Sequence, residues 1–231
     1  MKIKVLATGS SGNGYLITDN TGEVLVVEAG VDTHFIVGNT PYSPIGFIYS
    51  HKHKDHYRYF EKYKSYFSYL PTDKHYKKHS IGNYNIWSFP VLHDVENKGF
   101  IIANKIEKKV IFFATDLIYN STAKGFYADV FEFTNRFNID YYIIESNYNE
   151  YEFKQSLVGS GDVYGVKNHL SNYECARFLS HICNRNEVQN IMLIHGSNRI
   201  GRSIKGKKDP IRKLIPKAQI IIANKGTEVY F

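Results

Sequence analysis

The N-terminal half of the chain contains short apolar runs separated by Gly, Asn and Asp. Runs of this length, several of them with alternating apolar and polar positions, predict β-strands joined by tight turns. We expect strands at Lys2–Ala7, Gly14–Thr18, Glu23–Val27, Gly46–Tyr49 and Tyr84–Phe89.

A second batch of such runs begins at Gly99. The expected strands are Gly99–Asn104, Lys109–Ala114, Tyr141–Glu145, Asn190–Ile194, Gln219–Ala223 and Glu228–Phe231.

Helical periodicity is clearest at Asn172–Asn184, where an apolar face is formed by Cys175, Phe178, Leu179 and Ile182. We also expect helices at Tyr57–Lys64, Thr72–His79, Ala128–Asn138 and Asp209–Leu214. Mixed strands and helices in two similar halves predict an α/β protein of the αββα type, in which two mixed sheets pack face to face and helices lie outside. No repeat or low-complexity linker divides the chain, so we expect one domain over residues 1–231.

Polar side chains that can bind metals follow several of the expected strands. His51 follows the strand that ends at Tyr49, and His93, Asp116 and His195 each follow an apolar run of their own. Loops at strand ends commonly carry the ligand-binding residues of layered folds. The pattern therefore predicts a shared site built from four separate loops.

Residues 51–56 read His-Lys-His-Lys-Asp-His and carry the strongest chemical signal in the chain. The two-residue period of extended backbone points His51 and His53 the same way, while a turn would direct Asp55 and His56 to a neighbouring point. This arrangement suits two adjacent metal ions. Nitrogen and oxygen donors without thiolates favour zinc, manganese or iron, with zinc as the default. The alternative interpretation is a solvated polar loop.

Bulk composition narrows the class of protein. Apolar content is 43% and charged content 22%, as in ordinary soluble proteins, and no apolar run is long enough to cross a membrane. The chain opens directly into a strand-like segment without the apolar stretch of a signal peptide, so we expect cytoplasmic residence. Cys175 and Cys183 are expected to be reduced packing residues rather than a disulfide or metal ligands.

The net charge of +7 and the pI near 9.1 weakly favour a phosphate-bearing or polyanionic partner. Basic residues are concentrated after His195, where they would form either a solvated face or a phosphate-binding surface: Arg199, Arg202, Lys205, Lys207, Lys208, Arg212, Lys213 and Lys217. The Tyr-rich segments Tyr57–Tyr69 and Tyr148–Tyr151 would be either a homodimer face or a wall of the substrate site.

Four of these motifs together resemble the metallo-β-lactamase fold superfamily. They are residues 50–56 (Ser-His-Lys-His-Lys-Asp-His), His93, residues 114–116 (Ala-Thr-Asp) and residues 194–197 (Ile-His-Gly-Ser), and the resemblance covers almost the whole chain. Residues 9–13 (Gly-Ser-Ser-Gly-Asn), 144–147 (Ile-Glu-Ser-Asn) and 169–172 (His-Leu-Ser-Asn) are similar to those of YycJ-type hydrolases, a group linked with DNA exonuclease activity. The last two motifs also resemble transfer-RNA 3′-processing ribonucleases, and small phage enzymes that destroy cyclic-nucleotide signals share the ligand set.

The resemblance implies two Zn²⁺ ions, or Mn²⁺ in their place, and assigns a ligand set to each. His51, His53 and His93 would hold the first ion, and Asp55, His56 and His195 would hold the second. Asp116 would bridge the two. Two metals about 3.5–4 Å apart can share a hydroxide and clamp a phosphoryl oxygen during displacement, and Asp55 would orient that hydroxide and take its proton. Glu28 stands where relatives usually have Asp, and it is a candidate acceptor for the second nitrogen of a ligand histidine.

The resemblance also gives His169 a role as the acid that protonates the leaving alkoxide, with Glu145 holding its other ring nitrogen. A general acid of this kind contributes typically 10²–10⁴-fold. The alternative is an exposed histidine that caps the helix beginning near Ser171. Asn13, Ser197 and Arg199 are further candidates for contact with substrate, the last two because they lie close to His195 in the sequence; a simple loop explains them equally well.

These observations predict a dinuclear-zinc phosphodiesterase acting on a nucleic acid or nucleotide. Within this class, the similarity to YycJ-type hydrolases favours a DNA exonuclease. A cyclic-nucleotide phosphodiesterase is the first alternative, with a closed pocket that a second subunit would complete. A lactam, lactone or thioester hydrolase is another alternative, although it would leave His169 and Glu145 without a task. A metal-stabilised binding module would normally use a closed, thiolate-rich site, which this donor set does not resemble.

Overall fold

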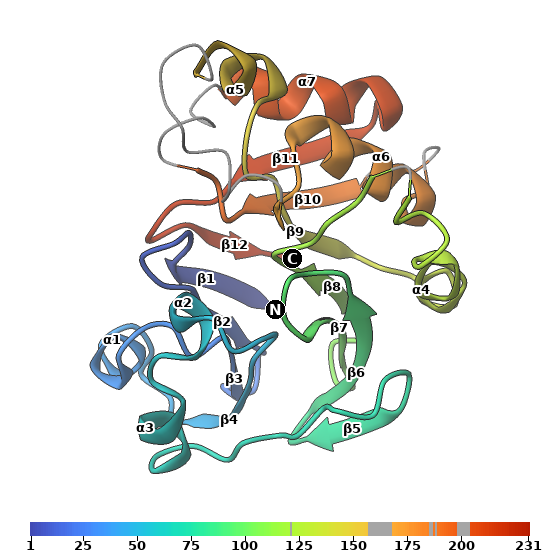
Figure 1. Ribbon diagram of the computed structural model, residues 1–231. Coiled ribbons are helices and arrows are strands. Elements are labelled where there is room, and N and C mark those ends of the chain that lie inside the picture. The colour runs from blue at the N-terminus through green and yellow to red at the C-terminus, as the bar shows by residue number, and fades with distance from the viewer. Residues whose placement is uncertain (121, 157–167, 185–186, 188, 198–203) are drawn as a thin grey trace.

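The computed structural model describes residues 1–120, 122–156, 168–184, 187, 189–197 and 204–231. Two β-sheets face each other, and helices cover their outer faces (Figure 1). Among these residues the first sheet has five strands in the order β12-β1-β2-β3-β4. Their bounds are β1 Lys2–Ala7, β2 Gly14–Thr18, β3 Val24–Val27, β4 Pro44–Ile48 and β12 Glu228–Tyr230.

The second sheet of the described chain has seven strands in the order β11-β10-β9-β8-β7-β6-β5. They are β5 Lys78–Ile81, β6 Tyr84–Val91, β7 Asn97–Asn104, β8 Val110–Ala114, β9 Tyr141–Glu145, β10 Gln189–Ile194 and β11 Ala218–Ile222. Strands β5 to β8 pair antiparallel, whereas β8, β9, β10 and β11 pair parallel. The carboxyl ends of the parallel strands therefore lie at one edge, which gathers the loops that follow them.

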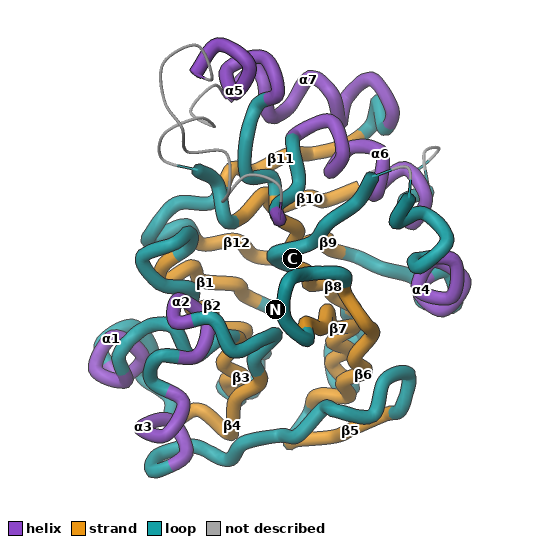
Figure 2. The backbone as a smooth tube through the Cα atoms, viewed as in Figure 1, coloured by secondary structure: helices purple, strands orange, loops and turns teal. Residues whose placement is uncertain are grey.

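Helices lie outside both sheets (Figure 2). Near the first sheet are α1 Thr33–Val37, α2 Lys54–Tyr57 and α3 Phe60–Lys64. Near the second are α4 Ala128–Thr134, α5 Glu150–Ser156, α6 Asn172–Ile182 and α7 Ile204–Leu214. Helix α6 starts at a capping box in which Ser171 and Glu174 bond each other's backbone N–H, and its expected apolar face is buried.

The core has three apolar layers. Between the sheets, Ile3, Val5 and Ile17 from the first sheet meet Phe100, Phe113 and other residues of the second. A second layer lies between the first sheet and α1 to α3, and a third lies between the second sheet and α4, α6 and α7. The predicted arrangement of two mixed sheets with helices outside is confirmed.

Residues Thr72–His79 were expected to form a helix, and this prediction is wrong. The segment runs as a loop into β5, whose pairing continues up to Ile81 opposite Tyr84. Gly82 and Asn83 form the two-residue turn between them, and Gly82 has a φ of +48°. Glycine followed by asparagine between two extended runs is a hairpin signal, and the cross-strand pairing outweighs the weak helical periodicity of the segment.

Three smaller differences concern helices. The expected helix Tyr57–Lys64 is divided, because the backbone N–H of Tyr59 bonds to the carbonyl of Ala29 and not to the preceding turn. Helices α1 and α5 were not predicted.

Cys175 and Cys183 are buried and unpaired, as expected. None of the helices in the described part of the chain combines the length and apolar character needed to cross a bilayer.

Candidate metal centre

All seven predicted metal ligands come together at the edge where the strands of both sheets end. His51 follows β4, His93 follows β6, Asp116 follows β8 and His195 follows β10. The remaining three surround the start of α2, with His53 as its N-cap residue and Asp55 and His56 inside it. Their donor atoms form overlapping groups whose members lie within 4.8 Å of one another.

The first group is formed by His51, His53 and His93. The Nδ1 atom of His53 lies 3.2 Å from Nε2 of His51 and 3.3 Å from Nε2 of His93. Donors about 2.0–2.1 Å from a tetrahedral zinc ion lie about 3.3–3.4 Å from one another. The spacing of these ring nitrogens therefore fits a shared zinc ion.

The second group is formed by Asp55, His56 and His195. Oδ2 of Asp55 lies 3.2 Å from Nε2 of His56 and 3.2 Å from Nε2 of His195. Asp116 lies between the groups: its Oδ2 is 3.1 Å from Nε2 of His56, and it also groups with His51. One carboxylate thus reaches both donor sets, which is the position that a bridging ligand needs.

Groups behind the ligands contact the second ring nitrogens. Nδ1 of His51 lies 2.9 Å from the Ser50 hydroxyl, and Nδ1 of His195 lies 3.3 Å from Oε1 of Glu145. Oε2 of the fully buried Glu28 lies 3.3 Å from Nδ1 of His56 and accepts a hydrogen bond from the backbone N–H of Ser50. Contacts of this kind fix ring orientation in metal sites. Glu28 therefore lies beside the second ring nitrogen of a predicted ligand histidine, as the sequence suggested. Its contact with His56, however, lacks hydrogen-bond geometry.

The backbone is left-handed at three residues of the centre. Glu28 has a φ of 72°, and Asp116 and His195 both have a φ of 53°. Residues other than glycine adopt this conformation rarely, and such residues cluster at functional sites. These three turns aim each side chain into the centre directly after a strand ends.

Burial and opposite charges set the protonation of the centre. Burial, with nearby His56, lowers the pKa of His51 to about 2, so its imidazole is neutral. Burial also lowers the pKa of His195, but Asp116, Asp55 and Glu145 outweigh it and raise that pKa to about 10. For Asp116 burial acts upward, whereas His195 and His56 hold its pKa well below the usual range. The centre is a compact set of carboxylates and imidazoles whose negative charges attract a cation.

His169 lies beside this centre and pairs with Glu145. Its Nδ1 is 2.5 Å from Oε1 of Glu145 and 3.2 Å from Oδ1 of Asp116. Burial lowers the pKa of His169, but Glu145 outweighs it and raises that pKa overall. The Glu145 carboxylate is fully buried, whereas 20% of the His169 side chain is exposed. His169 therefore lies between the predicted metal ligands and the open surface.

Similar solved structures have the same architecture. YhfI from Bacillus subtilis, a metallo-β-lactamase fold protein, matches with a TM-score of 0.70 and 16% identity over 99% of both chains. The chain has the metallo-β-lactamase fold. Yeast PDE1 matches with a TM-score of 0.68 and 12% identity over 100% of this chain and 99% of that one. The short form of human tRNase Z matches with a TM-score of 0.62 and 11% identity over 100% and 99%. No family model and no curated protein sequence matches the chain.

The remaining predicted site residues lie in different places on this metallo-β-lactamase fold. Asn13 is fully buried, and its Nδ2 lies 2.9 Å from Nε2 of His56 and 3.2 Å from Oδ2 of Asp55. It therefore packs behind the ligands, and its predicted contact with substrate stays a prediction. Ser197 lines a pocket next to His195, and Arg199 lies outside the described residues.

Three residues of the site had no role assigned from the sequence. The Thr8 hydroxyl accepts a hydrogen bond from the backbone N–H of His195 at 2.8 Å. Nδ2 of Asn147 donates to the His195 carbonyl at 2.9 Å. Oδ1 of Asp94 lies 3.0 Å from Nε2 of His93. The signal that could have found them was position in the sequence: Asn147 ends the motif at residues 144–147, Asp94 follows His93, and Thr8 directly precedes the motif at residues 9–13.

Proposed function

We propose that the chain is a dinuclear-zinc phosphodiesterase that hydrolyses phosphodiester bonds in nucleic acids or nucleotides. The observation that carries this proposal is a pair of three-donor groups joined by Asp116, with the paired His169 and Glu145 beside them. A site that only stores metal would not need a partly exposed histidine, His169, held beside the donor groups by the buried Glu145 carboxylate.

The donor chemistry supports zinc, with manganese as the substitute. The predicted ligands offer ring nitrogens and carboxylate oxygens, and both cysteines lie elsewhere, in the core layer behind the second sheet. When bound, two such ions lower the pKa of water and neutralise phosphoryl oxygens.

Asp55 is the residue proposed to orient the attacking water and to accept its proton. Burial acts to raise its pKa, but hydrogen bonds from His195 and His56 hold that pKa below the usual range, so the carboxylate is ionised. Asn13 holds this carboxylate from behind through the contact of its Nδ2 with Oδ2. One carboxylate oxygen is thereby fixed, and Oδ1 is the one left to face water.

His169 is proposed to protonate the departing alkoxide. Its Nδ1 is engaged by Glu145, so Nε2 is the ring nitrogen left for the substrate. Glu145 is itself held by the backbone N–H groups of Leu117 and Leu170, which donate to Oε2. A sugar oxygen is a poor leaving group, and an acid with a fixed orientation lowers the cost of its departure.

The comparisons support phosphoryl chemistry without selecting a substrate. The structures similar to this chain include tRNase Z and a diphosphatase of the PhnP family, but also an isothiocyanate hydrolase. One fold hosts several chemistries, so the argument rests on the site. The net charge of +7 supports a substrate that carries phosphate.

Hydrolysis of bis(p-nitrophenyl) phosphate by zinc- or manganese-loaded protein tests the proposal. We expect turnover that disappears in Asp55→Asn and persists in His34→Ala, a matched control at an exposed histidine on α1. Absence of turnover in the metal-loaded wild type would refute the proposed phosphodiesterase function. A panel of linear DNA, linear RNA and 3′,5′-cyclic nucleotides then selects the substrate class.

The homodimer stays a prediction, which sedimentation equilibrium would test.

A further inference from the structure

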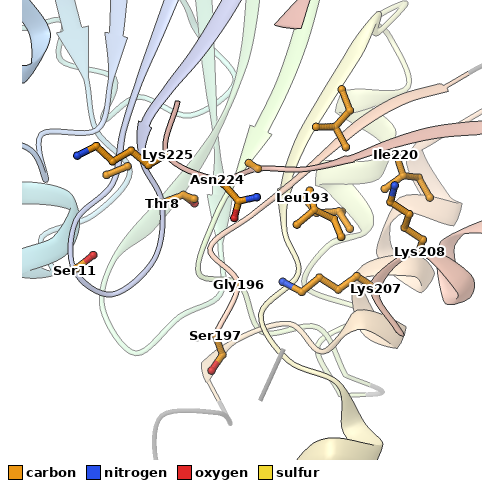
Figure 3. A pocket seen from close by; sticks show the side chains of 14 residues that line it. Thr8, Ser11, Leu193, Gly196, Ser197, Lys207, Lys208, Ile220, Asn224 and Lys225 are labelled. Carbon is orange, nitrogen blue, oxygen red and sulfur yellow. The ribbon is translucent and has the colours of Figure 1, made fainter. Parts of the chain in front are cut away.

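Figure 3 shows a pocket of about 760 Å³ whose lining includes Gly196 and Ser197, the two residues that follow His195. Its apolar wall comes from Leu193 of β10 and from β11. Its polar wall is formed by Thr8, Gly196, Ser197, Lys207, Lys208 and Asn224. The volume lies within the range of small-molecule sites and is large enough for a nucleotide unit.

The pocket and the metal centre share one edge of the second sheet. Gly196 and Ser197 directly follow His195, and Thr8 bonds the backbone of His195. Strand β11 pairs parallel to β10, and the N–H of Ala223 bonds to the carbonyl of Leu193. Asn224 therefore lies at the same strand ends as His195, one strand further from the centre. A substrate that extends beyond the scissile bond along this edge would enter the pocket.

Lys207 carries a buried positive charge in the pocket wall. Its side chain comes from α7, is only 5% exposed, and points toward Gly196 (Figure 3). A Cβ at Gly196 would lie 2.2 Å from the Lys207 Nζ, so glycine leaves the space that the ammonium occupies. Burial lowers the pKa of Lys207, although the attraction of Cys175, Glu145 and Glu152 acts to raise it.

A buried ammonium is costly unless an anion or several hydrogen bonds compensate for it. Lys208 and Lys225 also line the pocket and add positive charge to it. No described acidic residue is among the pocket-lining residues. The pocket is therefore matched to an anion that approaches from outside.

We propose that this pocket binds a second phosphate group of a nucleic-acid strand whose scissile phosphate lies at the metal centre. The inference rests on the proposed phosphodiesterase function and extends it, because it selects a substrate with at least two phosphates. A 3′,5′-cyclic nucleotide has a single phosphate, which the metal centre would take, and it would leave the lysines unused.

The test compares Lys207→Met with Lys213→Met on two substrates. Methionine keeps the apolar stem of the lysine and removes the charge, and Lys213 is an exposed residue of the same helix that does not line the pocket. For a short single-stranded oligothymidylate, we expect Lys207→Met to raise KM about tenfold or more, the effect of losing one charge-assisted hydrogen bond. Lys213→Met should leave KM nearly unchanged. Hydrolysis of bis(p-nitrophenyl) phosphate, which has no second phosphate, should change much less in Lys207→Met than hydrolysis of the oligothymidylate does.

Fluorescence polarisation with a labelled oligothymidylate adds a readout that does not need turnover. Lys207→Met should weaken binding and reduce the slope of log affinity against log salt by about 0.7, as expected for one lost phosphate contact on a single strand. Lys208→Met serves as a second pocket variant if Lys207→Met does not fold.

Equal KM and equal affinity in Lys207→Met and wild type would overturn the inference, as would equal losses on both substrates. Activity of the wild type on cyclic nucleotides but not on the oligonucleotide would overturn it too. Failure of the phosphodiesterase proposal is recognised separately, by a wild type that leaves bis(p-nitrophenyl) phosphate intact.

Discussion

Nδ1 of His169 lies 2.5 Å from Oε1 of Glu145, a fully buried carboxylate at the end of β9. Replacing His169 with Ala should reduce kcat by about 10²–10⁴-fold, because the leaving alkoxide then departs without a proton donor. Metal content, measured by inductively coupled plasma mass spectrometry, should remain that of the wild type. A variant with normal kcat would remove His169 from the mechanism, and one that loses its metals would make it a ligand.

Glu145→Gln should lower kcat while leaving His169 in place. The amide group that replaces Oε1 or Oε2 donates a hydrogen bond instead of accepting one, so it would conflict either with His169 or with the backbone N–H groups of Leu117 and Leu170. A buried donor facing another donor costs about 1–3 kcal/mol. Urea denaturation should show a loss of unfolding free energy of this size, together with the lower kcat. An unchanged unfolding free energy would argue against the observed hydrogen bonds.

Asp116→Asn should weaken both metal positions at once. Asp116 groups with His51 of the first donor set and with His56 and His195 of the second, so one substitution removes a negative charge from both donor sets. We expect about two zinc ions per chain in the wild type and fewer in the variant after dialysis. His53→Ala, by comparison, should affect only the first group. Equal metal content in Asp116→Asn and wild type would contradict a bridging role.

Chelation should destabilise the protein as well as inactivate it. Bound metal adds its binding free energy to the folded state, so removal lowers the melting temperature, and added zinc should restore it. Differential scanning calorimetry before and after treatment with a chelator measures the shift. An identical melting temperature in both states would indicate that the folded chain binds no metal there.

Gly30→Ala should disrupt the loop that supports Asp55. A Cβ at Gly30 would lie 1.7 Å from the carbonyl oxygen of Asp55 and 2.6 Å from the backbone nitrogen of Asn13, and backbone atoms cannot yield as a side-chain tip can. We expect a loss of about 2–4 kcal/mol in urea denaturation, the range of severe steric substitutions. Gly125→Ala is the matched control, since a Cβ there meets nothing within 4 Å. Similar stability of the two variants would contradict the close approach of these loops.

The local pattern alone was enough to predict several elements with their full bounds. Strands β1, β2 and β9 coincide with the predicted Lys2–Ala7, Gly14–Thr18 and Tyr141–Glu145. Their burial is set by residues within the segment, so tertiary contacts reinforce a preference that already exists. Residues Thr72–His79 had no such clear preference: Lys78 and His79 pair with β6, and the residues before them form a loop.

By itself the sequence determined which residue types could donate to a metal and that they follow strands. Both are visible along the chain, because a histidine or an aspartate stands directly after an apolar run. Only the tertiary structure decided which of them meet. The parallel order of β8, β9 and β10 brings Asp116, Glu145 and His195 to one edge. Packing between the two sheets brings Thr8 to His195, and the packing of α7 brings Lys207 to Gly196; no short-range pattern links either pair. Strand order and register arise from packing between distant segments, and this packing determines the distances on which the chemistry depends.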